Sequence, residues 1–128
     1  MSYHFHKTVD MDIDAAEARV TELLKERGFG VLTYIDVQAT MKQKLDEDVP
    51  AYRILGACNP PFAFKALQSE RLIGTMLPCN VIVRDAGEGR TEVAAVDPIA
   101  SMQAVDNPAL GEIATEVHDR MKSLIEEL

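Results

Sequence analysis

A buried strand that turns directly into a helix, over Leu55–Lys65, constrains this chain more than any other stretch. Small and apolar residues run up to Cys58, and Asn59 and two prolines follow at once. Asn59 suits a helix N-cap, because its side-chain oxygen can accept a hydrogen bond from a first-turn amide. Pro60 suits the first helical position, where no N–H is needed. Cys58 is therefore expected beside the positive end of a helix dipole, where a thiol loses its proton more easily.

Apolar periodicity along the rest of the chain predicts the element order β-α-β-α-β-α-β-β-α. The strands are expected at residues 2–9, 29–37, 52–58, 80–84 and 91–96. The helices are expected from Ile13 to a stop at Gly28, from Val37 to Leu45, from Pro60 to about Leu72, and from Pro108 onward. The last helix carries the longest apolar stripe, and glycines at 87 and 89 make the final two strands a hairpin.

This order favours an α/β (α+β) fold in one domain that spans residues 1–128. We expect a two-layer sandwich, with a mixed sheet of about five strands and the helices on one face. In the second strand, Val31 and Ile35 should share one face, and Leu32 and Tyr34 the other. Several strands are apolar on both sides, which indicates that the second face is partly covered. A second copy in a homodimer is the simplest cover; a loop or the short second helix is the alternative.

Charge and composition exclude several classes of partner. The net charge of -8 argues against nucleic acid and against an anionic membrane surface. No apolar run approaches the roughly 18 residues of a spanning helix, and the N-terminus lacks the apolar core of a signal peptide. A cytoplasmic location with reduced thiols is therefore expected. No metal site is predicted, because His4, His6, His118 and the two cysteines form no convincing four-ligand set for zinc.

The two cysteines are the main candidates for chemistry. Cys79 lies in Leu77-Pro78-Cys79-Asn80, just before a strand. If the third and fourth strands are antiparallel, Cys58 and Cys79 become neighbours at one end of the sheet. Cys58 could then act as a nucleophile with Cys79 as its resolving thiol. Alternatively, both are small buried hydrophobes, as free cysteines commonly are.

The same turns could instead bind a small ligand, for which no cofactor can be named. Free amides at the helix N-terminus would attract an anion, with Lys65 and Arg53 or Arg84 adding positive charge. Phe62, Phe64 and Met76 would supply an apolar wall, unless the phenylalanines only fill the core. The candidate ligand-binding residues are Cys58, Asn59, Phe62, Lys65, Pro78, Cys79 and Asn80.

Three motifs in order resemble the domain-of-unknown-function family 302 of bacteria and archaea. They are Leu55-Gly56-Ala57-Cys58-Asn59-Pro60, then Leu77-Pro78-Cys79-Asn80-Val81-Ile82-Val83, then Val96-Asp97-Pro98. The resemblance covers nearly the whole chain. It implies a compact α/β domain, often a homodimer, with no settled activity, no catalytic residue to transfer, and an occasional association with sulfur or redox metabolism.

Three hypotheses about function follow. The first is a small-ligand-binding domain with a pocket at the cysteine-bearing turns, for an anionic or thiol-containing ligand. The second is a thiol-dependent redox or sulfur-transfer enzyme that uses Cys58 and Cys79. The third is a structural subunit of a larger complex.

Overall fold

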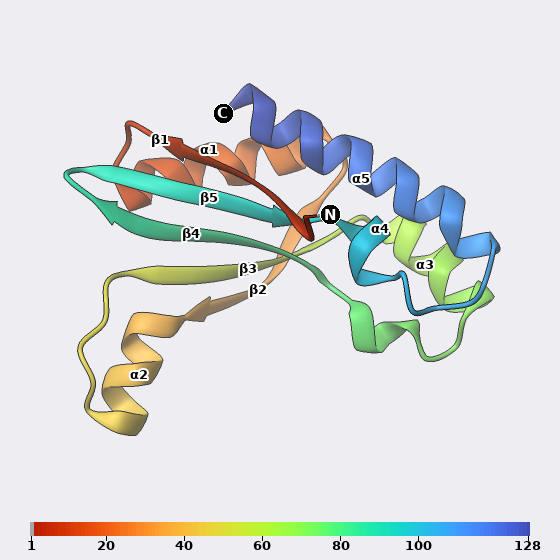
Figure 1. Cartoon of the computed structure of the whole chain (residues 1–128), viewed down its shortest axis with the longest axis horizontal. Helices are drawn as coiled ribbons and strands as arrows, with labels where there is room; N and C mark the ends of the chain where they lie inside the picture. Colours follow the sequence, from red (N-terminus) through yellow and green to blue (C-terminus); the bar gives the residue numbers. More distant parts are fainter. Residues whose placement is uncertain (1) are drawn as a thin grey trace.

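The computed structural model describes residues 2–128 and confirms the α/β class, the five strands and their predicted order (Figure 1). The elements are β1 (His4–Val9), α1 (Ile13–Glu26), β2 (Gly30–Asp36), α2 (Val37–Leu45), β3 (Tyr52–Cys58), α3 (Pro60–Ser69), the 3-10 turn η1 (Ile73–Met76), β4 (Cys79–Gly87), β5 (Arg90–Val96), α4 (Pro98–Ser101) and α5 (Ala109–Glu127). The short helices η1 and α4 are additions to the prediction. None of the helices described in residues 2–128 has the length and apolar character that crossing a bilayer requires.

The sheet has the order β1-β5-β4-β3-β2, and every neighbouring pair is antiparallel. The prediction of a mixed sheet is therefore wrong. The helix between β2 and β3, and the helices between β3 and β4, lie at opposite ends of the sheet (Figure 1). Each connection joins two antiparallel neighbours, as a hairpin loop does, and contains helices inserted in the loop. A βαβ crossover, by contrast, would carry the chain across the sheet to a parallel neighbour.

Helices α1 and α5 pack over one face of the sheet and bury the main core between the layers (Figure 1). Removal of this apolar surface from water is the main source of the stability of the fold. The largest contributors are fully buried side chains from both layers: Val20, Leu23, Leu24, Leu55, Val81, Val83, Val93, Met121 and Leu124. We call this helix-covered side the closed face.

The other side, which we call the open face, is lined by alternate residues of the same strands. The cross-strand row His6–Ala94–Ile82–Ile54–Ile35 lies on it. A hollow of about 530 Å³ occupies this face, and its described lining comes only from Tyr3 and strand residues. Neither α2 nor a later loop contributes to that lining within residues 2–128, so the alternative cover, by a loop or the short second helix, is not found at the hollow.

An irregularity in β2 corrects the predicted faces of that strand. The register against β3 shifts between Val31 and Thr33. Val31 pairs with Ala57 on the closed face, whereas Ile35 pairs with Ile54 on the open face. The two residues were predicted to share a face, and this is wrong because a bulge inserts one extra residue and reverses the alternation beyond it.

Candidate functional site

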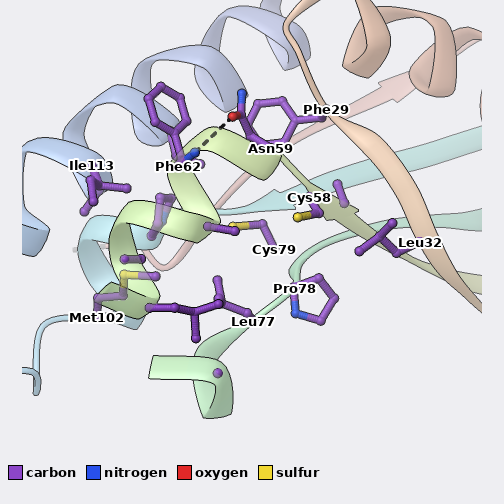
Figure 2. A pocket seen from close by; sticks show the side chains of 18 residues that line it. Phe29, Leu32, Cys58, Asn59, Phe62, Leu77, Pro78, Cys79, Met102 and Ile113 are labelled. Atoms are coloured by element: carbon purple, nitrogen blue, oxygen red, sulfur yellow. Dashed lines mark hydrogen bonds between the residues drawn. The ribbon is translucent and has the colours of Figure 1, made fainter. Parts of the chain in front are cut away.

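A cavity of about 340 Å³ lies where β3 runs into α3, at the end of the closed face (Figure 2). Its walls come from the end of β3, one side of α3, the turn before β4, the short helix α4 and the first half of α5. Five of the seven predicted ligand-binding residues line it: Cys58, Asn59, Phe62, Pro78 and Cys79. The two cysteine-bearing turns therefore converge, as the sequence predicts.

The capping of α3 is confirmed. The side-chain oxygen of Asn59 accepts a hydrogen bond from the backbone N–H of Phe62 at 3.3 Å, and prolines occupy the first two helical positions (Figure 2). Asn59 is 8% exposed, so its carboxamide is part of the packed structure.

The same capping removes the anion site that was predicted at this helix end. Pro60 and Pro61 have no N–H, the N–H of Phe62 is taken by Asn59, and that of Ala63 donates to the Asn59 carbonyl at 2.9 Å. None of these first-turn positions keeps a free amide. An anion at the start of α3 would therefore find no free backbone N–H in the first turn.

The two thiols come from adjacent strands. Ala57 pairs with Cys79 across β3 and β4, which places Cys58 one position from that pair. Both thiols are free; Cys79 is buried and Cys58 is half-buried. Burial raises the pKa of Cys79 to about 11, and the neighbouring Cys58 adds to the rise. Cys79 is therefore a protonated thiol at neutral pH, which is poorly suited to fast thiol exchange.

The remaining lining is apolar. Phe29, Leu77, Met102 and Val117 are among its largest members, and no charged side chain of residues 2–128 lines the cavity. Together with the missing amides, this lining opposes the prediction of an anionic ligand, because an unpaired charge is costly to bury.

Two predicted ligand-binding residues lie elsewhere. Lys65 borders a shallow hollow on the outer side of α3, and Asn80 faces the open-face hollow. Asn80 follows Cys79 in the same strand, so its side chain points to the opposite face. Phe64 and Met76, predicted as an apolar wall, are exposed and lie outside the cavity lining.

Neither arginine considered for the pocket reaches it. Arg53 lies on the closed face and pairs with Asp14 at 2.8 Å and Glu17 at 3.0 Å on α1. Arg84 lies on the open face and pairs with Glu92 at 2.7 Å. Both arginines therefore form ion pairs elsewhere on the sheet. Neither places a positive charge in the cavity.

Two close packing arrangements hold the cavity walls. Pro78, which follows a cis peptide bond, lies against Gly56. A Cβ atom at Gly56 would be 2.6 Å from Pro78 Cγ and 2.0 Å from Thr33 Oγ1, so only glycine fits without rearrangement. On the other side, the Arg120 guanidinium lies 4.8 Å from the centre of the Phe62 ring, a cation–π contact that fixes this aromatic wall.

A side-chain pair that sequence reasoning missed joins α4 to α5 beside the cavity. Asp97 Oδ1 lies 2.8 Å from His118 Nδ1 and also accepts the Ile99 N–H at 3.0 Å, so Asp97 caps α4. The next residues in the wall are Pro98 and Val117, which line the cavity. The Asp-Pro dipeptide could have signalled the cap, but nothing local in the sequence indicates the histidine partner.

The histidines of β1 belong to the open face. His6 Nδ1 lies 3.0 Å from Glu92 Oε2, and hydrogen bonds from His6 and Arg84 hold the pKa of Glu92 below its usual value. His4 Nδ1 is buried and has no hydrogen-bond partner within residues 2–128. Among residues 2–128, no three His, Cys, Asp or Glu side chains come together in a group that could hold a metal ion.

Comparison with known proteins finds a similar solved structure but no similar curated protein. The crystal structure of an uncharacterized conserved protein DUF302 from Bacillus stearothermophilus resembles this chain with a TM-score of 0.89. The sequence identity is 28%, and the similarity covers 98% of each chain. No curated protein matches the sequence. The family model described as "Domain of unknown function DUF302" matches residues 5–128, as the three motifs predicted, and the chain therefore belongs to this family.

Proposed function

We propose that the protein binds a small, uncharged and largely apolar ligand in the cavity between its two cysteine-bearing turns. The observation that carries the proposal is the lining: about 340 Å³ of space bounded by apolar side chains, two thiols and one carboxamide. Small-molecule sites are commonly apolar, with a few polar groups that fix the orientation of the ligand. Asn59 and the thiols would supply those groups.

Two exposed leucines support an entry route. Leu32 on β2 and Leu67 on α3 both line the cavity, yet 69% and 46% of their surfaces are exposed to solvent. Exposed apolar residues at the rim of an apolar cavity are typical of a ligand entrance. A ligand that entered between them would cover this surface, and removal of the surface from water would favour binding.

A pair of environment-sensitive dyes tests the chemical class of the ligand. The uncharged naphthalene dye prodan should bind with one site per chain and a blue-shifted emission. The anionic dye anilinonaphthalene sulfonate should bind at least about tenfold more weakly, a difference of about 1.4 kcal/mol, because no cation lines the cavity. Equal or tighter binding of the anionic dye would contradict an uncharged ligand.

A matched pair of substitutions on α5 tests the location. Ala114 lines the cavity, whereas Ala109 is exposed at the start of the same helix. Ala114→Leu should fill the space and weaken prodan binding by about tenfold or more, whereas Ala109→Leu should leave it unchanged. Thermal melts of both variants check that the fold survives. If prodan binds both variants as it binds the wild-type protein, the dye sits elsewhere.

The thiol-enzyme hypothesis is less well supported, because Cys79 is buried and protonated. A raised thiol pKa means that the reactive thiolate forms only as the pH approaches about 11. Alkylation of Cys79 by iodoacetamide, followed by peptide mass spectrometry from pH 6 upward, should therefore be slow at pH 8, where only about one thiol in a thousand is ionised. Alkylation of Cys58, the nucleophile of that hypothesis, with a midpoint below the free-thiol value of about 8.5 would favour the enzyme instead.

We also propose that the open face is the contact between two copies of the chain. Ile82, Ala94 and Val96 form its half-buried apolar floor, and Arg84 and Glu92 put both signs of charge side by side on it. A twofold contact can then set positive against negative charge, as isologous interfaces do.

Sedimentation equilibrium tests this contact. The wild-type protein should be a dimer, and Ile82→Glu, at the centre of the open face, should make it a monomer. Leu72→Glu, at an exposed apolar residue outside the open-face hollow, is the matched control and should remain dimeric. A wild-type protein that stays monomeric at high concentration would contradict the proposal.

A further inference from the structure

Three sulfur atoms line the cavity. Cys58 and Cys79 enter from adjacent strands on the same wall, and the thioether of Met102 lines another part (Figure 2). Both thiols are free, and Cys79 is only 8% exposed. Two free thiols that line the same apolar cavity form a pair of soft ligands.

We propose that Cys58 and Cys79 together bind a soft, closed-shell metal cation, of which Cu(I) is the test case. This inference goes beyond the proposed function, because binding of an apolar molecule needs neither sulfur atom.

The ligand set selects the metal. Thiolates are soft ligands that favour Cu(I), whereas carboxylates and carbonyls favour hard cations. No carboxylate or imidazole of residues 2–128 lines the cavity, so hard cations have no anionic oxygen ligand there. A structural zinc ion takes four ligands, and no group of even three His, Cys, Asp or Glu side chains is found within residues 2–128. Cu(I) can be held by two thiolates alone.

The binding step balances without oxidation. Cu(I) replaces the proton of each thiol, two copper–sulfur bonds form, and two protons pass to the buffer. Copper stays Cu(I), and the bound unit carries one negative charge. Helix α3 begins at Pro60, two residues after Cys58, so the positive end of its dipole lies near this charge. Because Cys58 is half-buried, water can also reach and screen this charge.

Anaerobic competition with the chromogenic Cu(I) chelator bathocuproine disulfonate tests the site. The wild-type protein should withhold one Cu(I) per chain from the chelator and should not bind Zn(II) under the same conditions. Cys58→Ala and Cys79→Ala should each weaken Cu(I) binding by about 100-fold or more, since even second-shell changes weaken metal sites by 10- to 100-fold. X-ray absorption should show sulfur as the only neighbour of copper.

Met102→Leu is the matched control, because it removes a sulfur from the same cavity at similar volume and keeps both thiols. It should bind Cu(I) as the wild-type protein does. The proposal is overturned if the wild-type protein loses Cu(I) to the chelator, if the alanine variants retain it, if Met102→Leu loses it equally, or if nitrogen or oxygen neighbours copper.

Prodan binding, measured on the same samples, separates this proposal from the proposed function. Cysteine variants that bind prodan and melt like the wild-type protein are folded, so their loss of Cu(I) is specific. Prodan binding without Cu(I) binding overturns only the metal site. Cu(I) binding without prodan binding overturns only the apolar-ligand site.

Discussion

The two faces of the sheet use the same strands and similar residues, but they differ in what covers them. Leu55 on the closed face is fully buried beneath the helices, while its neighbour Ile54 on the open face is half-buried. The closed face ends in an apolar cavity without charge, whereas the open face carries the cluster of His6, Arg84 and Glu92. Apolar strand residues alone therefore do not define a site. The helix cover encloses an apolar cavity at one end of the closed face and leaves the open face with a half-buried surface that carries charged side chains.

Neighbouring substitutions in β3 should separate the two faces most clearly. Leu55→Ala should lower the free energy of unfolding by about 2 to 5 kcal/mol, because it leaves a cavity in the closed core. Ile54→Ala should lower it by only about 1 kcal/mol, because part of this side chain is already in water. Urea denaturation at low protein concentration measures both. Equal losses would contradict the contrast, and a loss for Ile54→Ala that grows with protein concentration would indicate that a second copy covers the open face.

Gly56 tests the point where β2, β3 and the Pro78 turn meet. Gly56→Ala should lower the free energy of unfolding by about 1 to 3 kcal/mol, because the new methyl group overlaps Thr33 and Pro78. It should also weaken prodan binding, since Pro78 belongs to the cavity wall. Gly30→Ala is the control in the neighbouring strand. Apart from Gly30 itself and its two chain neighbours, no atom of residues 2–128 lies within 4 Å of a Cβ at this position, so this change should be neutral or stabilising by up to about 1 kcal/mol. Similar effects at both glycines would show that the close packing at Gly56 is unimportant.

Features that depend on neighbouring residues could be predicted from the sequence. The cap at Asn59 follows from Asn-Pro, and the stop at Gly28 is confirmed by its φ of 83°, a conformation that favours glycine. Features that depend on distant residues could not. The bulge in β2 appears only in its pairing with β3, and the Asp97–His118 contact joins residues 21 positions apart.

The candidate site divides in the same way. The two cysteines were expected together because each ends or begins a strand, and the register of β3 and β4 places them so. Asn80 could have been excluded from the sequence, because adjacent strand residues point to opposite faces. Lys65 lies on the outer side of α3, whereas Phe62 and Ala66, four apart, line the cavity. Residues of α3 line the cavity when they are four apart and so share one side of the helix. Lys65 was predicted only because it is close to Cys58 in the sequence, and this criterion does not select one side of a helix.

The cap of α4 allows a finer test at the cavity end of the sheet. Asp97→Ala should lower the free energy of unfolding by about 1 to 2 kcal/mol, because it removes a cap and leaves His118 without its partner. Asp36 caps α2 at the opposite end and accepts the Ala39 N–H at 2.9 Å. Asp36→Ala should lose only the cap, about 1 kcal/mol or less. The difference between the two variants in thermal or urea unfolding measures the histidine contact, and equal losses would show that it contributes nothing.

The smallest effect is expected at Glu92 on the open face. Its pKa is lowered first by the hydrogen bond with His6 and then by that with Arg84. A carboxylate with a lowered folded-state pKa stabilises the protein above its unfolded value near 4.5, and this contribution is lost as the pH falls through the folded value. Because the pair is partly exposed, Glu92→Gln should lower the free energy of unfolding at pH 7 by less than about 1 kcal/mol.

Urea unfolding of Glu92→Gln and wild-type protein, at pH 7 and at about pH 2, measures this contribution, and the gap should close at the lower pH. Glu88→Gln, in the turn of the same hairpin, is the control, because no ion pair of Glu88 is found within residues 2–128. A gap that persists in acid would mean that the charge of Glu92 is not its cause. A loss well above 1 kcal/mol at pH 7 would mean that Glu92 is shielded from water in solution. A second copy that covered the open face would shield it in this way. Both faces of the sheet would then be buried, the closed face by helices of the same chain and the open face by the second copy.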